Sequence, residues 1–523
     1  MKPPRVRVLL RLARAVCLGL FSGAGLGVSL SAAVPKLDQL FPIAVPAGAT
    51  TVVGSAGKFE PWPVTVWTDT PGLVIRAEKD AGKFSVEVGA GVSAGPHLIR
   101  AYNHAGASAP RFVIVTARPD VAEVEPNDDV AKAQRIAPLP ATIGGRLGKA
   151  GDVDSYAVTL SADQTLVAAL DAYVLASPVD AVLRLVDATG RELAFNHDNG
   201  RNLDPALAWT APAAGTYVLQ VFGFAHPATS DVKFTGSEAC VYRLHLGLGP
   251  QARPVPPAVD GPEFTAPNFP AGTAAQPAPA APFAVTGGIE RIGDEHRFAF
   301  AAAKGDRLVL EIQSASLGFP LDAWLAVKNA AGKELVRNDD SAGADPVVEW
   351  TAPESGTFTA VVGSVLHRAG SDYRYRLYVR AARPRLQAVI AEPGFTVEPG
   401  KSTAIKVTAR RLEGFKTKLV ASVTGLPDDV CAPPVEVGES AKEFSLQLTA
   451  DPAAKPFSGP IGIVLREANS DTLRTAVHEL ISTALDNGVP QGFRDLVIPA
   501  TEQIWLTVPP APPAKPTPPP KTP

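Results

Sequence analysis

Cysteine is scarce in this sequence of 523 residues, which contains only Cys17, Cys240 and Cys431. Small secreted domains without a large core are usually held together by several closely spaced disulfides. Cys240 and Cys431 lie too far apart in the sequence to form such a framework, and the sequence leaves open whether they pair at all. The chain must therefore be stabilised by hydrophobic cores, for which a hydrophobic fraction of 46% is sufficient.

The sequence also lacks a basic excess and long apolar runs. With 49 Lys and Arg against 52 Asp and Glu, it has no surplus of positive charge to neutralise phosphates, so nucleic acid is not an expected partner. After residue 33, no uncharged apolar stretch reaches the roughly 20 residues of a membrane-spanning helix. The sequence therefore predicts no transmembrane span in the mature chain.

Residues 1–33 have the three-part order of a secretory signal peptide. Basic residues come first, an apolar and small-residue stretch follows over 16–28, and Ser31-Ala32-Ala33 offers a small-residue cleavage site. We expect cleavage near Ala33, which predicts a secreted, periplasmic or cell-surface protein.

Catalytic motifs are missing as well. The only methionine is Met1, so the Gly-Thr-Ser-Met motif of subtilisin-type nucleophiles does not occur, and there is no Gly-x-Ser-x-Gly elbow. His478-Glu479 begins like a zinc-protease helix, but Ser482 stands where the second histidine is required. We therefore predict that the protein is not an enzyme, and we assign no catalytic or organic cofactor-binding residues.

An internal repeat determines the predicted architecture. Residues 178–183 (Pro-Val-Asp-Ala-Val-Leu) return as 320–325 (Pro-Leu-Asp-Ala-Trp-Leu), and residues 209–217 return as 350–358 in the pattern Trp-Thr-Ala-Pro-x-x-Gly-Thr-aromatic. The offset is 142 residues in the first pair and 141 in the second. Such ordered similarity at a nearly constant offset indicates two related domains in tandem.

The periodicity of the chain is that of β-strands. Apolar and β-branched residues form short segments between Gly and Pro turns, and amphipathic helices are almost absent. The predicted fold class is all-β, with tandem antiparallel β-sandwiches of Ig-like and jelly-roll-like type and a Pro-rich linker and tail. The expected order is a signal peptide (1–33), an N-terminal sandwich (36–118), a first repeat (119–249), a Pro/Ala-rich linker (250–282), a second repeat (283–382), an Ig-like sandwich (385–485), and a terminal strand with a Pro-rich tail (486–523).

The two repeats resemble the bacterial pre-peptidase C-terminal (PPC) domain, a secreted β-sandwich that is also related to the collagen-binding domains of clostridial collagenases. The motifs that carry the resemblance are Glu-Val-Glu-Pro-Asn-Asp-Asp at 123–129, Gly-Asp-Val-Asp-Ser-Tyr at 151–156, the hairpin with Asp180 and Gly190, and Gly-Thr-Tyr at 215–217. The order of all four domains resembles large secreted proteins of planctomycete-type bacteria. The resemblance implies a module that accompanies proteases and is not itself a peptidase.

The segment from residue 123 to 128 predicts a metal site. Alternate side chains of an extended segment point the same way, so Glu123, Glu125 and Asn127 place three oxygen donors on one face. Asp152 and Asp154 alternate similarly at the start of a predicted strand, and Ca²⁺ takes six to eight oxygen ligands. The resemblance implies the same cation, because collagen-binding members bind calcium through matching residues. We therefore expect calcium to be bound by Glu123, Glu125, Asn127, Asp128, Asp152 and Asp154.

Simpler interpretations compete with these assignments. Asn127 or Asp128 could only cap a short helical turn over 129–136, with the glutamates in solvent. A second polar cluster, which contains Asn196 and Asn338, is interpreted as loop side chains that bond their own backbone. The second repeat is assigned no metal site, because Glu295-His296 follows Asp294 and no Glu-Pro-Asn segment precedes it.

The sequence thus favours a secreted, non-catalytic protein that attaches to an extracellular polysaccharide or fibrous protein through its PPC-like modules, the first of which is stabilised by calcium. Two alternatives remain open. One is a structural spacer of the cell envelope. The other is a non-catalytic, protease-associated companion or remnant of a secreted hydrolase.

Overall fold

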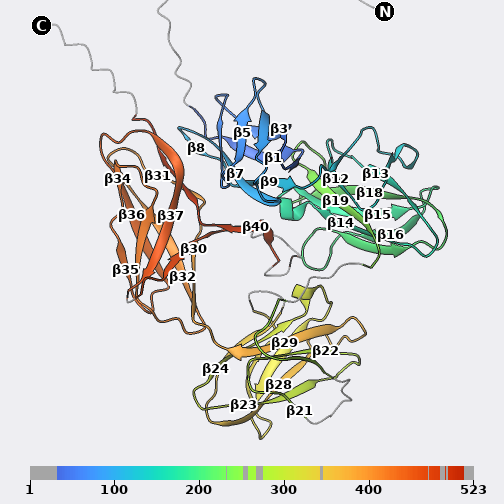
Figure 1. The fold of residues 1–523 in the computed structure, drawn as a ribbon, viewed down its shortest axis with the longest axis vertical. Coiled ribbons are helices and arrows are strands. Elements are labelled where there is room, and N and C mark those ends of the chain that lie inside the picture. The colour runs from blue at the N-terminus through green and yellow to red at the C-terminus, as the bar shows by residue number, and fades with distance from the viewer. Residues whose placement is uncertain are drawn as a thin grey trace, which may run out of the picture.

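The computed structural model describes residues 32–230, 232–250, 257–266, 275–341, 345–468, 470–482, 489 and 493–511. Most of the predicted signal peptide and Pro-rich tail lie outside these ranges. Within them the fold is all-β, as predicted, and the only helical elements are three single 3₁₀ turns: η1 (Val130–Lys132), η2 (Tyr173–Leu175) and η3 (Ala315–Leu317). The strands form four β-sandwiches (Figure 1). None of the described helical turns is long and apolar enough to cross a membrane.

The first and fourth sandwiches stand at the two ends of the chain. One sheet of the first sandwich runs β1 (Lys36–Phe41), β3 (Thr50–Lys58), β6 (Lys83–Val88) and β5 (Leu73–Ala77), and the other runs β2 (Ala44–Pro46), β9 (Arg111–Thr116), β7 (Gly95–Asn103) and β4 (Thr65–Thr68), with β8 (Gly106–Ala107) beside β7. The sheets of the fourth sandwich are β30 (Arg385–Ile390), β32 (Ser402–Leu412), β36 (Glu443–Ala450), β34 (Val430–Cys431), and β31 (Gly394–Thr396), β41 (Ile504–Val508), β37 (Phe457–Glu467), β33 (Leu419–Thr424), β35 (Val435–Val437), with β38 (Leu473–Thr475) beside β37.

The second and third sandwiches share one strand order in both sheets. In the second sandwich the sheets are β10 (Val121–Ala122), β12 (Ala141–Arg146), β19 (Val241–Leu248), β14 (Thr165–Asp171), β17 (Ala206–Thr210), and β11 (Gln134–Arg135), β13 (Asp154–Leu160), β18 (Gly215–Ala225), β15 (Val179–Val186), β16 (Glu192–Asn196). In the third they are β20 (Glu263–Thr265), β22 (Phe283–Gly288), β29 (Arg374–Ala381), β24 (Arg307–Gln313), β27 (Val347–Thr351), and β21 (Gln276–Pro277), β23 (His296–Ala302), β28 (Gly356–Ser364), β25 (Ala323–Lys328), β26 (Glu334–Asn338).

The way the second sandwich begins positions the candidate site. Its first two strands, β10 and β11, are short edge strands that pair parallel with β12 and β13. Because β10 borders one sheet and β11 borders the other, the segment 123–133 between them crosses from sheet to sheet. The core of the sandwich lies between these sheets, and strands such as β14 alternate buried and half-buried residues, as one core-facing side requires.

Two expected domain boundaries are wrong. β20 and β21 lie inside the expected linker 250–282, yet they are edge strands of the third sandwich. Proline is compatible with an edge strand, because the missing N–H can face away from the ladder, so a Pro-rich composition did not exclude pairing. β41 lies beyond the expected end of the fourth sandwich at 485, yet it pairs with both β31 and β37. A strand that follows a long excursion of the chain thus completes the fourth sandwich.

The excursion before β41 contains a two-stranded sheet, β39 (His478–Ile481) and β40 (Asp495–Thr501), which we call the strap. In Figure 1, β40 extends from the fourth sandwich toward the first and second sandwiches. His478-Glu479 therefore belongs to a strand, in which residues four positions apart lie about 13 Å from each other, too far for two side chains to bind one zinc ion as they do on a helix.

Glu413 joins the third sandwich to the fourth. Its side chain is 2% exposed and its carboxylate accepts two hydrogen bonds from Arg380, at 2.7 and 2.9 Å. It also accepts bonds from the backbone N–H of Arg383 at 2.6 Å and from Nε of Arg385 at 3.2 Å. The hydrogen-bonded guanidinium of Arg380, followed by the N–H of Arg383, lowers the pKa of Glu413 to about 2. The joint is thus a buried, fully bonded carboxylate.

We predict that Glu413→Gln destabilises this joint by about 3 kcal/mol, because Arg380 loses its charged partner in a buried position. A carboxylate with a lowered pKa stabilises the folded state fully above its ordinary pKa of 4.5, and this contribution is lost as the pH falls toward 2. Calorimetric unfolding should therefore show a wild-type–variant difference that is constant above pH 5 and shrinks below pH 4.5.

Glu443→Gln is the matched control, because Glu443 is 61% exposed and forms a surface pair with Lys406 in the same sandwich. Its effect should stay below about 1 kcal/mol. A Glu413→Gln difference that does not change between pH 5 and pH 2 would contradict the assignment of the charged joint.

Candidate metal centre

The segment 123–129 is fastened to both sheets of the second sandwich. At its start, the backbone N–H of Glu123 donates to the carbonyl of Gly144 in β12 at 3.2 Å. Further along, the N–H of Ser155 in β13 donates to the carbonyl of Asn127 at 3.1 Å. These two bonds lay the acidic segment across the beginning of β13, which is the placement that a shared site with Asp152 and Asp154 requires.

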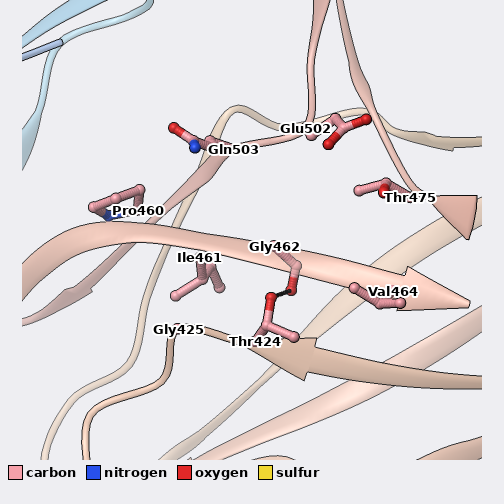
Figure 2. A pocket seen from close by; sticks show the side chains of 9 residues that line it. All are labelled: Thr424, Gly425, Pro460, Ile461, Gly462, Val464, Thr475, Glu502 and Gln503. Atoms are coloured by element: carbon pink, nitrogen blue, oxygen red, sulfur yellow. Dashed lines mark hydrogen bonds between the residues drawn. The ribbon is translucent and has the colours of Figure 1, made fainter. Parts of the chain in front are cut away.

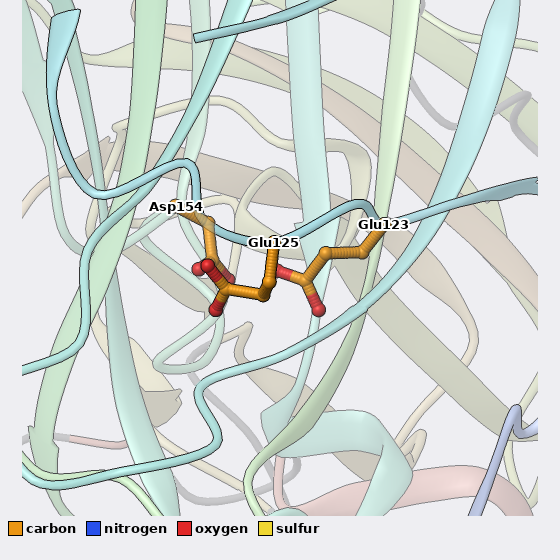
Figure 3. Close-up of side chains that lie close together, drawn as sticks. All are labelled: Glu123, Glu125 and Asp154. Atoms are coloured by element: carbon orange, nitrogen blue, oxygen red, sulfur yellow. The ribbon is translucent and has the colours of Figure 1, made fainter. Parts of the chain in front are cut away.

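Three of the six predicted ligands converge. Glu123, Glu125 and Asp154 each offer a carboxylate oxygen, and these oxygens lie within 4.8 Å of one another (Figure 3). Asp154 is fully buried, Glu123 is half-buried and Glu125 is exposed. The group therefore has a buried floor and a side that is open to solvent, through which an ion could enter.

Two further predicted ligands present unsatisfied oxygens. Asn127 and Asp152 are 0% and 1% exposed, and neither Oδ1 of Asn127 nor Oδ1 of Asp152 makes a hydrogen bond. Oδ1 of Asp154 is buried and unbonded too, as is the amide nitrogen of Asn127. Buried polar atoms are nearly always hydrogen-bonded, so these unbonded oxygens, of which only Oδ1 of Asp152 has an ion-pair contact, with Lys149 at 3.5 Å, call for an explanation. A bound cation supplies one.

Asp128, the sixth predicted ligand, has another partner. Its Oδ1 lies 3.1 Å from Nζ of Lys149, which is also 3.5 Å from Oδ1 of Asp152. Lys149 is 61% exposed, so this ion pair lies at the rim of the site. The alternative that Asn127 or Asp128 caps the following turn is wrong, because Asp129 occupies the N-cap position of η1 and makes no side-chain capping bond.

Two buried tyrosines, which the sequence analysis did not assign to the site, orient its carboxylates. The hydroxyl of Tyr242 donates to Oδ2 of Asp154 at 2.5 Å, and the hydroxyls of Tyr156 and Tyr242 are 2.5 Å apart. The backbone N–H of Arg146 donates to Oε2 of Glu123 at 2.9 Å. The hydroxyl of Tyr156 also donates to Oε1 of Glu123 at 3.4 Å, so both oxygens of Glu123 are bonded, whereas Oδ1 of Asp154 is not. The available signal was the Tyr-Arg-Leu triplet at Tyr242, which both repeats contain.

The electrostatics of this group favour a cation. Burial raises the pKa of Glu123, and burial followed by the negative charge of Glu123 raises the pKa of Asp154. Neighbouring carboxylates disfavour each other's ionised form, and a divalent cation between them removes that penalty. The donor set consists of carboxylate and amide oxygens only, which fits hard Ca²⁺ and not a metal that prefers nitrogen or sulfur.

The third sandwich has other residues at the corresponding positions. Ala266 stands in place of Glu123. The backbone N–H of Ala266 donates to the carbonyl of Thr286, just as that of Glu123 donates to the carbonyl of Gly144. His296 begins β23 as Asp154 begins β13, and its Nδ1 lies 2.6 Å from the hydroxyl of Tyr375. Burial lowers the pKa of His296 to about 4, so the residue is neutral at pH 7. The hydrogen bond to a buried tyrosine is present in both sandwiches, whereas the carboxylates of Glu123 and Asp154 are replaced in the third, which retains only Asp294 at the position of Asp152.

The two asparagines of the second polar cluster have structural roles. Oδ1 of Asn196 accepts from the N–H of Ala206, and Oδ1 of Asn338 accepts from the N–H of Asp340, so both asparagines stabilise their own loops. Trp209 and Trp350 pack against Tyr217 and Phe358 at the cores, with ring centroids 4.8 and 4.6 Å apart.

A shallow hollow of about 300 Å³ lies on the fourth sandwich (Figure 2). Glu502 is the one titratable side chain in its lining, so the hollow offers no acid–base pair. Its remaining lining residues are Thr424, Gly425, Pro460, Ile461, Gly462, Val464, Thr475 and Gln503.

Comparison with known proteins gives partial similarities. No family model matches the chain. A probable subtilase-type serine protease of Deinococcus radiodurans is 36% identical over 117 residues, which are 21% of this chain and 16% of the protease. The chain thus spans less than a fifth of the length of that relative.

Two solved structures are similar at 10% identity. The alignment with the pre-peptidase C-terminal domain of a collagenase from Bacillus anthracis spans 21% of this chain and 99% of that domain, with a TM-score of 0.18. The alignment with domains 1–6 of the surface layer protein SbsC spans 86% of this chain and 55% of the SbsC chain, with a TM-score of 0.15. TM-scores this low do not establish a common overall fold.

Neighbouring glycines of β12 allow the tyrosine arrangement to be tested. A β-carbon on Gly145 would lie 2.3 Å from the ring of Tyr242, whereas one on Gly144 would have no neighbour closer than 3.8 Å. We predict that Gly145→Ala destabilises the second sandwich by about 1–3 kcal/mol, because the ring must move away from Asp154. Gly144→Ala should change the stability by less than about 1 kcal/mol. Thermal unfolding of the two variants measures this, and equal melting temperatures would show that Tyr242 is not confined as described.

Proposed function

We propose that this chain is a secreted, non-catalytic attachment protein whose second sandwich binds Ca²⁺. The observation that carries the calcium assignment is the set of three buried, unbonded oxygens of Asn127, Asp152 and Asp154 beside the converging carboxylates of Glu123 and Glu125. The ion would link the segment that enters the second sandwich to the start of β13. Its chemistry would be charge neutralisation and stiffening of the carboxylate group.

Five of the six expected ligands are supported by this arrangement. Asp128 is the exception, because its carboxylate pairs with Lys149. The ammonium of Lys149 also lies near Asp152, so it is the residue that competes with a cation for the negative charge at the rim.

Calcium binding is tested by melting and titration of the full mature chain. At millimolar calcium, a site with a dissociation constant about tenfold lower contributes about 1.4 kcal/mol, which raises the melting temperature of the second sandwich by about 3–8 °C over a chelator. Asp154→Asn combined with Glu125→Gln should abolish this rise and the heat of calcium titration.

Asp129→Asn is the matched control, because Asp129 lies in the same segment but is 63% exposed and paired with Lys132. It should retain calcium binding within about twofold, as expected of a surface pair. Equal melting of the wild type with calcium and with chelator, together with a flat titration, would remove the site.

The packing of the tryptophans bears on which class of partner the protein attaches to. Trp62 packs against the first core, Trp209 and Trp350 pack against the repeat cores, and Trp324 is covered by Arg337. Trp67 and Trp505 pack against each other with ring centroids 5.9 Å apart. None of the six tryptophans, all of which lie in described residues, is an open platform for a sugar ring. Of the two expected partner classes, we therefore favour a fibrous protein over a polysaccharide.

Partner class is tested by pull-down of the mature chain on collagen, cellulose, chitin and cell-wall preparations in calcium buffer. We expect saturable binding to the fibrous protein, and weaker binding of the Asp154→Asn, Glu125→Gln double variant. Retention on cellulose or chitin alone would shift the assignment to a polysaccharide, and no retention on any material would favour an envelope spacer. Hydrolysis of casein by the pure chain would overturn the non-catalytic role.

The similarity to a probable subtilase-type protease over 117 residues supports a second candidate, a non-catalytic companion of a secreted protease. In that case the chain would co-purify with protease activity that it does not itself possess.

A further inference from the structure

The strap packs where the first and second sandwiches meet. From the strap, Leu480 of β39 and residues 496–498 of β40 contribute apolar side chains. They meet Leu98 and Phe112 of the first sandwich and Ala176 of the second in one cluster, in which Leu480 is 6% exposed. The strap therefore buries apolar surface on two sandwiches other than its own.

A second apolar cluster continues the contact along the junction. Ile43, Ala44 and Ile114 of the first sandwich pack with Leu175 and Val241 of the second, and Val497 of the strap packs against this group. Beside it, the buried Nε2 of Gln39 donates to the carbonyl of Leu175 at 2.7 Å. Val497 thus takes part in both clusters and lies where all three parts of the chain meet.

A buried arginine fastens the fourth sandwich to the first. Arg100 of β7 is 2% exposed, and its guanidinium donates to the carbonyl of Pro393 at 2.8 Å and to that of Ser108 at 2.9 Å. The same guanidinium lies 5.2 Å from the centre of the Trp505 ring of β41, and Tyr102 packs on this ring at 5.0 Å. A buried cation held by carbonyls and an aromatic face resists separation of the two sandwiches.

The first, second and fourth sandwiches therefore close into one body, although the third sandwich lies between the second and the fourth in the sequence. Each of the three contacts the other two, through Arg100, the strap and the Gln39–Leu175 bond. In Figure 1 the strap lies at the centre of this body and the third sandwich stands apart from it, joined to the fourth through Glu413.

The same junction lies next to the candidate metal centre. Val241, fully buried in the junction, is followed directly by Tyr242, which donates to Asp154. Arg146, whose backbone N–H holds Glu123, places its guanidinium 4.7 Å from the ring of Phe41 in the first sandwich. Phe41 in turn packs against the cluster that contains Val497. Two short routes of contact thus lead from the strap to carboxylates of the site.

We propose that the strap is a conformational lock that holds the first, second and fourth sandwiches in one orientation, and that its docking and calcium binding strengthen each other. The lock follows from the packing alone. The coupling rests on the proposed calcium site, since the docked strap supports Tyr242 and Arg146, which orient Asp154 and Glu123. By linkage, a strap that favours the calcium-binding geometry must itself be favoured by calcium to the same degree.

Adjacent residues of β39 give a matched pair of variants in the full chain. Leu480→Asp places a charge in the buried cluster, whereas Ile481→Asp places the same charge on a side chain that is 46% exposed. Small-angle scattering should show a larger radius of gyration for Leu480→Asp and an unchanged one for Ile481→Asp. Calcium titration should show an affinity at least about fivefold lower for Leu480→Asp only, which is the scale of a modest coupling between sites.

Val497→Asp, in the other strand of the strap, is a second variant that distinguishes undocking of the strap from a folding defect confined to β39. Neither Leu480 nor Val497 belongs to the core of the fourth sandwich, so both variants should keep its β-sheet circular dichroism and expand in the same way. Scattering profiles identical to the wild type for both variants would overturn the lock. An expanded shape with unchanged calcium affinity would overturn the coupling. If the wild type binds no calcium, the proposed site fails, but the scattering comparison still decides the lock.

Discussion

The hydrogen bond from Tyr242 to Asp154 is the constraint on which the second sandwich is built. It crosses the core, because Tyr242 belongs to β19 of one sheet and Asp154 to β13 of the other. A buried carboxylate is destabilising unless its oxygens are bonded, and this bond satisfies only one of them. The third sandwich retains the bond between its sheets as Tyr375 to His296, with a neutral partner. Both sandwiches therefore contain a polar link between their sheets, and the second adds the carboxylates of Glu123 and Glu125 beside it.

The all-β class could be predicted because strands have local sequence signals, namely the alternation of apolar and polar residues and the turn residues between them. The repeat with an offset of 142 residues independently indicated that the two central sandwiches are similar to each other. The boundaries could not be predicted as well. β21 contains Pro277, and its Pro-rich sequence is typical of a linker. Its pairing with β23 depends on a sheet edge that exists only in the folded sandwich. β41 follows the strap, and nothing in its local sequence shows that it returns to the interior of the fourth sandwich.

The candidate site could likewise be predicted only in part. The spacing of Glu123 and Glu125 and of Asp152 and Asp154 was visible, because alternation in an extended chain is a local property. The pairing of Asp128 with Lys149, and the tyrosine hydroxyls beside Asp154, depend on residues brought together by tertiary structure. A sequence can therefore indicate which residues could bind a cation, but not which of them already have another partner.

The converging carboxylates lie next to the junction of the first and second sandwiches, where a rigid connection would be useful. Without a disulfide framework, the arrangement of the sandwiches depends on packing between them, and such interfaces are weak unless they are large and apolar. The first and second sandwiches meet through a small apolar cluster, and the segment that connects them carries Glu123 and Glu125. A cation there would fix the connecting segment to the sheet that bears Asp154, while the strap closes the same junction from the fourth sandwich. The third sandwich has Ala266 and His296 at the equivalent positions and takes no part in the closed body. The apolar contact between sandwiches and the converging carboxylates thus occur at one junction.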